Sequence, residues 1–127
     1  MVLVDSSVWI GLQNVGFDDL LDGDEPAVCL PIIQEVLQGA RSEWEFRGLR
    51  EIFRTMIVLE SPLSSEVYDE AVTIYRHARA RGFTIRSMND CLIAACAVRN
   101  GVSVMHNDRD YAKIALVTSL QQRNLAN

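Results

Sequence analysis

Short apolar runs alternate along the chain with longer segments whose apolar residues recur at helical spacing. Apolar runs at Met1–Val4, Ala27–Leu30, Ile57–Leu59 and Val102–Met105 predict buried strands, and a last strand is expected near Leu116–Thr118. Helices are expected in the segments between the strands. This alternation predicts a central parallel sheet with helices on both faces, so the fold class is α/β and the architecture a three-layer α/β/α sandwich.

The segments between the strands carry signals of helix starts and ends. The predicted helices are one with Val8, Trp9 and Leu12 on its apolar face, one from Pro31 to Gly39, one after Ser42, and three over Ser64–Arg81, Ser87–Asn100 and Tyr111–Leu116. Ser42 and Glu45 have the spacing of a capping box at the start of an amphipathic helix. The acidic segment from Phe17 to Glu25 is predicted to be solvated surface.

Length and composition are typical of one domain spanning residues 1–127, because 127 residues of which 49% are hydrophobic suffice for a single core. The apolar runs are too short to span a bilayer, and the start of the chain lacks the basic and long apolar regions of a secretory signal. The three cysteines have spacings unlike those of a disulfide scaffold, which favours a reducing cytoplasm. We expect Cys91 and Cys96 to be small core residues.

The net charge of −5 argues against a general nucleic-acid-binding surface. However, every basic residue except Lys113 is arginine, the side chain that suits bidentate contact with phosphate. Carboxylates that bind metal ions also make a chain look more acidic than the loaded protein is. The charge therefore leaves a metal-dependent nucleic-acid enzyme open.

Two aspartates come directly after predicted strands. Asp5 follows the first strand, and Asp108 follows the fourth. In open α/β sheets, ligands bind beyond the carboxyl ends of the strands, so both side chains are expected at the binding edge. Aspartate is also a favoured N-cap residue, and taken alone each position is explained as well by a helix start.

Asp90 and Glu35 are carboxylates within apolar helical patterns. Asp90 shares a helix face with Ile93 and Ala94, which should face the core. A carboxylate there is costly unless it is paired or binds a metal, although a capping box between Ser87 and Asp90 is a structural alternative. Glu35 lies in the helix that begins at Pro31. It is either a site carboxylate or an exposed residue of an amphipathic helix.

The four carboxylates, Asp5, Glu35, Asp90 and Asp108, indicate a metal site only when they are considered together. Several carboxylates in one water-accessible cleft would repel one another, and hard divalent cations such as Mg²⁺ or Mn²⁺, which take oxygen ligands, relieve that repulsion. Such a cation activates water for attack on a phosphodiester. Other classes fit less well: a haloacid-dehalogenase-type phosphatase needs an aspartate where Ser7 stands, a receiver domain needs an acidic pair near Asp5, and no glycine-rich nucleotide-binding motif is present.

Four segments carry a resemblance to a known family. They are LVDSSVWI at Leu3–Ile10, IIQEVLQG at Ile32–Gly39, RSMNDCLIAACAV at Arg86–Val98 and HNDRDY at His106–Tyr111. In this order they resemble the PIN-domain ribonucleases, and more closely the VapC-type toxins of bacterial type II toxin–antitoxin systems. The resemblance extends over essentially the whole chain.

The resemblance implies a PIN-like sandwich that hydrolyses RNA as a Mg²⁺- or Mn²⁺-dependent endoribonuclease. It implies that Asp5, Glu35, Asp90 and Asp108 are the catalytic residues, with Asp5, Asp90 and Asp108 as metal ligands. It also implies a homodimer and neutralisation by a cognate antitoxin whose tail enters the active site. The alternative from another class is a non-catalytic PIN-like module for protein interaction, against which the presence of all four acids speaks.

Residues around the four acids are expected to support them. Ser6 stands where many relatives have threonine, and His106 where many have threonine or serine, so His106 is either a group that reaches substrate or water or a strand-end residue without chemistry. Asp110 is either a supporting acid or a solvated helix-start residue. Arg86 and Arg109 adjoin acidic positions and are expected to contact RNA phosphates.

The antitoxin is expected to be a short protein with a basic tail, since arginine among carboxylates displaces metal and blocks RNA together. Its apolar contact is predicted on the segment from Trp44 to Met56, with Trp44 and Phe46 as anchors. Leu49, Ile52 and Phe53 have the spacing of a core-facing helix and are expected to be buried instead.

Overall fold

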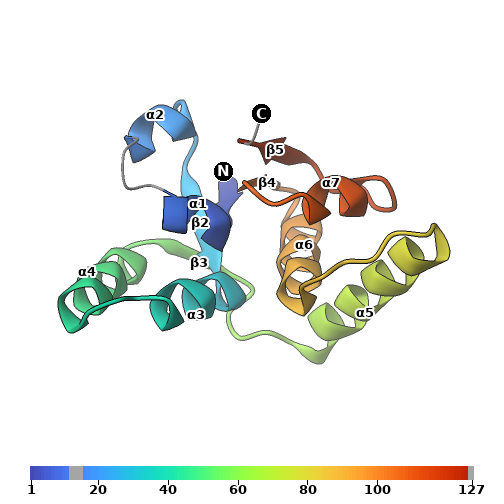
Figure 1. The fold of residues 1–127 in the computed structure, drawn as a ribbon, viewed down its shortest axis with the longest axis horizontal. Helices are drawn as coiled ribbons and strands as arrows, with labels where there is room; N and C mark the ends of the chain where they lie inside the picture. Colours follow the sequence, from blue (N-terminus) through green and yellow to red (C-terminus); the bar gives the residue numbers. More distant parts are fainter. Residues whose placement is uncertain (12–15, 126–127) are drawn as a thin grey trace.

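The computed structural model, which describes residues 1–11 and 16–125, contains a five-stranded parallel sheet (Figure 1). Its strands are β1 (Val2–Val4), β2 (Pro26–Cys29), β3 (Ile57–Leu59), β4 (Ser103–His106) and β5 (Gln122–Asn124). They lie in the order β3-β2-β1-β4-β5, and every neighbouring pair is parallel. The chain moves outward from β1 to β3 and then returns to β4 on the other side of β1. The crevice between β1 and β4 is therefore the topological switch point, where α/β sheets bind their ligands.

The helices lie in the connections, and all of them except α2 are predicted by the apolar stripes. They are α1 (Ser6–Gly11), α2 (Phe17–Leu21), α3 (Leu30–Gln38), α4 (Glu43–Arg54), α5 (Ser65–Ala80), α6 (Met88–Asn100) and α7 (Asp110–Ala115). Pro31 lies in the first turn of α3, and Gly101 ends α6 with a φ of 64°, a left-handed conformation that glycine adopts without strain. Figure 1 shows α3 and α4 on one side of the view and α5, α6 and α7 on the other.

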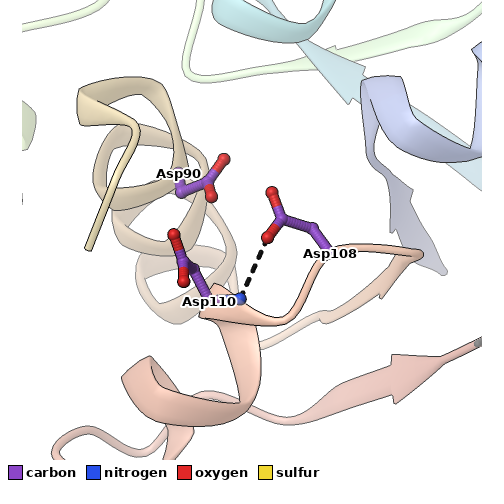
Figure 2. A group of neighbouring side chains, drawn as sticks. All are labelled: Asp90, Asp108 and Asp110. Atoms are coloured by element: carbon purple, nitrogen blue, oxygen red, sulfur yellow. Dashed lines mark hydrogen bonds between the residues drawn. The ribbon is translucent and has the colours of Figure 1, made fainter. Parts of the chain in front are cut away.

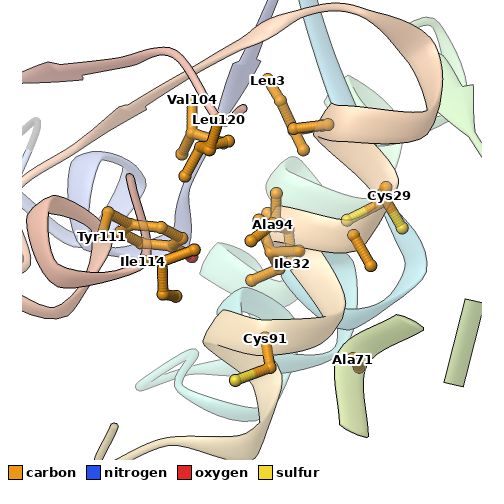
Figure 3. Packing of buried hydrophobic residues seen from close by; sticks show 14 of the residues in the cluster. Leu3, Cys29, Ile32, Ala71, Cys91, Ala94, Val104, Tyr111, Ile114 and Leu120 are labelled. Atoms are coloured by element: carbon orange, nitrogen blue, oxygen red, sulfur yellow. The ribbon is translucent and has the colours of Figure 1, made fainter. Parts of the chain in front are cut away.

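Alternate residues of the central strands pack into two apolar clusters. Val2 and Val4 of β1 point into a small cluster with Val8 and Leu21 from α1 and α2. Leu3 points to the opposite face, into the large cluster that α3, α5, α6 and α7 complete (Figure 3). This division follows from the two-residue period of a strand. The three-layer α/β/α sandwich with a central parallel sheet is confirmed.

Most predicted elements are present within one or two residues of their expected bounds, and the cysteines are unpaired and buried, as expected. The predicted last strand is wrong. Leu116–Thr118 forms a turn after α7, and the fifth strand is Gln122–Asn124. This strand pairs with β4 through its backbone, while its side chains are polar, so no apolar pattern marks it.

The charge run within Phe17–Glu25 is solvated, as expected, since Asp18, Asp19, Asp22 and Glu25 are exposed. The same segment also forms α2 over Phe17–Leu21, and Leu21 is buried against β1. Asp24 binds the guanidinium of Arg123 on β5 at 2.9 Å, and this hydrogen bond lowers the pKa of Asp24. The acidic run therefore includes a core contact and an ion pair. Leu12, expected on the first helix, lies outside the described residues.

None of the helices within the described ranges is long and apolar enough to cross a membrane.

Candidate metal centre

Three aspartates converge at the carboxyl end of β4. Asp90 lies in the first turn of α6, Asp108 in the loop after β4, and Asp110 at the start of α7, and Figure 2 shows their carboxylates turned toward one another. One oxygen from each lies within 4.8 Å of the others. Carboxylate oxygens are the ligands that Mg²⁺ and Mn²⁺ prefer.

Of the three aspartates, Asp90 has the fewest hydrogen-bond partners for its carboxylate oxygens among the described residues. Its side chain is 4% exposed, and its Oδ2 atom is buried without a hydrogen-bond partner among the described residues. Burial and the neighbouring carboxylate of Asp108 raise the pKa of Asp90 to about 9. The capping-box alternative is not supported, because the Ser87 side chain caps nothing and the Asp90 amide donates to the Ser87 carbonyl instead. A buried carboxylate without a partner needs either a proton or a cation.

Asp108 and Asp110 are held in place by backbone and basic groups. The Asp110 amide donates to Asp108 Oδ1 at 2.9 Å, and Arg86 lies 3.6 Å from the same oxygen. Asp110 is 1% exposed and accepts hydrogen bonds from the Arg86 backbone and the Lys113 ammonium. Burial opposes ionisation of Asp110, but these bonds outweigh it, so the pKa of Asp110 is lowered. The expectation of a solvated helix-start residue is wrong for Asp110: it is a buried, paired acid.

Asp5 lies across the switch point from Asp108 and is also buried, with 2% of its surface exposed. Its amide donates to the Met105 carbonyl, which joins the end of β1 to β4. Its Oδ1 accepts a hydrogen bond from the Tyr111 hydroxyl at 2.7 Å, and its Oδ2 accepts from the amide and hydroxyl of Ser7. Asp5 lies near enough to Asp90 for its charge to contribute to the raised pKa of Asp90.

Glu35 of α3 reaches the same region from the opposite side. Its Oε2 accepts a hydrogen bond from the Ser6 hydroxyl at 3.2 Å, and its Oε1 accepts one from the Asn89 amide at 3.1 Å. Glu35 is thus fixed between α1 and α6 by two residues that directly adjoin Asp5 and Asp90 in the sequence. Ser6, expected to be a supporting residue, orients this carboxylate.

His106 is fully buried at the end of β4. Its Nδ1 accepts the Asp108 amide at 3.1 Å, so the other nitrogen carries the proton and donates to Gln122 Oε1 at 2.6 Å. Both ring nitrogens are therefore engaged within the protein, and neither faces substrate. The geometry favours the expectation of a strand-end residue that does not reach substrate or water. His106 also positions the backbone of Asp108.

Several residues at the site were not anticipated from the sequence. They are Ser7, Asn89, Tyr111 and Lys113, which bind Asp5, Glu35, Asp5 and Asp110 respectively. Asn89 is adjacent to Asp90, but its contact is with a glutamate 54 positions away. Arg109 is exposed beside Asp108.

The residues present fit a hard divalent cation. The donor set consists of carboxylate oxygens, and it includes Asp90, which has a buried oxygen without a hydrogen-bond partner among the described residues. Asp110 is the weaker ligand of the three, because both of its oxygens already bind cationic side chains. Asp90 and Asp108 are therefore the primary candidates, and Asp5 is a further carboxylate whose charge acts on Asp90.

Fold and site together define a parallel α/β protein with a buried acidic centre at its switch point. The model of the PIN domain family matches residues 2–117, and the chain belongs to this family. It is similar to the ribonuclease VapC11 of Mycobacterium tuberculosis, with 35% identity over 95% of this chain and 96% of the relative.

Solved structures with the same fold include a DNA-bound VapBC from Salmonella typhimurium, with a TM-score of 0.76, 15% identity and coverage of 97% and 96% of the two chains. VapBC-1 from nontypeable Haemophilus influenzae has a TM-score of 0.75 and 16% identity, and 98% of each chain is covered. These likenesses confirm the fold, and the family match confirms the resemblance seen in the sequence.

Proposed function

We propose that this protein is a Mg²⁺- or Mn²⁺-dependent endoribonuclease that acts as a toxin and is neutralised by a cognate antitoxin. The observation that carries the proposal is the convergence of Asp90, Asp108 and Asp110 around an unpartnered buried oxygen. Membership of the PIN domain family and similarity to relatives named ribonuclease support it. The reducing cytoplasm is the proposed location, consistent with unpaired cysteines.

Each acid has a separate proposed role. Asp5, Asp90 and Asp108 hold the cation, while Asp110 keeps Arg86 and the Asp108 loop in place. When bound, the cation supplies a Lewis acid for the scissile phosphate and lowers the pKa of water. Each Glu35 oxygen accepts one hydrogen bond and keeps a further acceptor site, so Glu35 can orient an attacking water.

Arg86 and Arg109 are proposed to contact RNA phosphates beside the centre. The Arg86 side chain is 58% exposed although it touches Asp108 and Asp110, so its outer nitrogens are accessible. Arg109 is exposed next to Asp108. A guanidinium at each position suits the phosphates on either side of the scissile bond.

Purified protein is expected to cleave single-stranded RNA with Mg²⁺ or Mn²⁺ and to stop when a chelator is added, because the carboxylates alone repel phosphate. Gel analysis of labelled RNA measures this, with restoration by excess Mn²⁺ as the control for chelator damage. Undiminished cleavage in chelator contradicts the metal mechanism. No cleavage with either metal favours the alternative of a non-catalytic interaction module.

The proposed antitoxin contact is the exposed side of α4. Trp44 is 87% exposed, and Phe46 is half-buried under the guanidinium of Arg50. Phe53 is buried against Trp9, as expected of a core-facing residue, and Leu49 is half-buried. The expectation that Ile52 is buried is wrong, because it is 47% exposed beside a hollow that Trp9 and Leu49 also line.

Trp44→Ala is expected to weaken binding of the short protein encoded beside this one by at least about ten-fold, since exposed aromatic anchors dominate such interfaces. Calorimetry with the purified neighbour measures the affinity. Arg47→Gln, a change at another exposed position of α4, is the control and should leave affinity within about three-fold. If the neighbouring protein neither binds nor relieves toxicity on co-expression, the toxin–antitoxin assignment fails and the nuclease assignment stands.

A homodimer is the expected state of the free protein, and its molar mass in solution tests this expectation.

A further inference from the structure

The stretch from Ala71 to Asn89 contains no acidic residue, although the chain as a whole has a net charge of −5. It carries Arg76, Arg79, Arg81 and Arg86, four of the chain's twelve basic residues. The first three lie at the C-terminal end of α5 and are exposed. This segment therefore carries net positive charge in an acidic protein, and it ends at the metal centre.

A groove of about 610 Å³ runs between α5 and α6, which pack against each other (Figure 1). Arg86 and Asn89 line the groove. Both also contact the acidic site, since Asn89 donates to Glu35 and Arg86 binds Asp110. One end of the groove thus opens beside the metal centre.

Tyr75 connects this groove to the arginines of α5. Tyr75 lines the groove, and together with Arg76 and Arg79 it lines an adjoining hollow of about 360 Å³. Arg79 Nη1 lies 3.4 Å from the Tyr75 hydroxyl, to which it donates a hydrogen bond. Among the described residues, no ion pair engages the side chain of Arg76 or Arg79. The two guanidinium groups are therefore available to a partner.

We propose that single-stranded RNA flanking the scissile phosphate lies along this groove, with its phosphates on Arg86, Arg79 and Arg76 and a base against the ring of Tyr75. The inference rests on the proposed nuclease function and specifies where its substrate lies. Proteins that bind single strands combine arginines that follow the backbone with aromatic rings on which bases stack. An apolar floor with a basic rim provides both.

Charge separates RNA from one other occupant. A basic antitoxin tail would be repelled by these arginines. A second copy of this chain is the occupant that the molar mass in solution tests. RNA is the partner whose charge complements this surface.

The test compares Arg76→Gln/Arg79→Gln with Arg47→Gln/Arg54→Gln. Both double variants remove two charges, but Arg47 and Arg54 are exposed on α4 and already paired with Glu43 and Glu51. Binding of a fluorescein-labelled single-stranded RNA of mixed sequence is measured by anisotropy at several salt concentrations. The cleavage-deficient Asp90→Asn protein serves as the background, so that the RNA remains intact.

The α5 variant is expected to lower the slope of log affinity against log salt by about 1.4, about 0.7 for each lost phosphate contact on a single strand. In the wild-type background the KM for RNA should rise and kcat should change little, because neither arginine touches the reacting atoms. The α4 variant should leave both slope and KM unchanged.

Equal effects of the two double variants would overturn the proposal, because they would reflect net charge alone. It would also be overturned if the α5 variant changed only the molar mass in solution or only antitoxin affinity, which would make the groove a protein interface. If the wild-type protein cuts no RNA at all, the nuclease function fails, and the anisotropy comparison still decides whether RNA lies here.

Discussion

Asp90→Asn is expected to lower RNA cleavage by at least about 10³-fold and to stabilise the metal-free protein. The loss of activity follows because the substitution removes the charge of a primary cation ligand. The gain in stability follows because burial beside Asp108 and Asp5 keeps Asp90 protonated in the metal-free folded protein, whereas the unfolded chain releases this proton, and a neutral amide does not carry that cost. A ligand that is costly to folding and needed for activity is typical of a functional site.

The stability difference should depend on pH. The folded-state pKa of Asp90 is about 9, above the ordinary aspartate pKa of 3.8 that applies to the unfolded chain. The metal-free folded protein therefore retains a proton that the unfolded chain releases. Its free energy of unfolding falls as pH rises between these two values, by at most about 1.4 kcal/mol per pH unit from this residue.

Urea unfolding in chelator at several pH values, followed by circular dichroism, measures this effect. The advantage of Asp90→Asn over wild type should grow as the pH rises from about 5 to 8. Asp69→Asn, the same substitution at an exposed position of α5, should change neither stability nor cleavage. An Asp90→Asn protein less stable than wild type at pH 8 would show that the carboxylate has a partner that the geometry does not reveal.

Asp5→Asn is expected to abolish cleavage to a similar extent but with the opposite effect on stability. Asp5 accepts hydrogen bonds from Tyr111 and from both the amide and the hydroxyl of Ser7. Asparagine offers one acceptor oxygen, so its amide group must face one of these donors. A buried donor left unpaired costs about 1–3 kcal/mol, which relief of repulsion with Asp90 only partly offsets.

Thermal unfolding in chelator should therefore rank Asp90→Asn above wild type and Asp5→Asn below it. Tyr111→Phe is the matched control, because it removes one donor to Asp5 and leaves every carboxylate in place. That variant should lose stability and keep cleavage within about ten-fold of wild type. Wild-type turnover by Asp5→Asn would remove Asp5 from the site.

The sequence predicts which carboxylates lie at this site better than it predicts the residues that bind and orient them. Asp5 and Asp108 could be placed because residues after parallel strands meet at one edge of the sheet, and Asp90 because it interrupts an apolar helix face. Both arguments use periodicity, which is local and visible in the chain. Periodicity could not predict β5, because its polar side chains form no apolar pattern. They bind His106 and Asp24, which are distant in the sequence.

The supporting contacts were not predictable for a related reason. Tyr111 has the spacing of an ordinary core residue, and nothing local shows that its hydroxyl reaches an aspartate 106 positions away. Asp110 lies where a solvated helix-start residue is expected, and it is instead buried and hydrogen-bonded to Arg86 and Lys113. Such hydrogen bonds join distant segments, so they depend on the completed tertiary structure.

The claim that the converging carboxylates bind a divalent cation is tested most directly by calorimetric titration of the purified protein with Mn²⁺. We predict saturable binding to wild type and to Asp69→Asn, and loss of that binding in Asp90→Asn. The loss is expected because the unpartnered Asp90 oxygen is a primary ligand. Equal Mn²⁺ binding by wild type and Asp90→Asn, or no binding by wild type, would contradict the account.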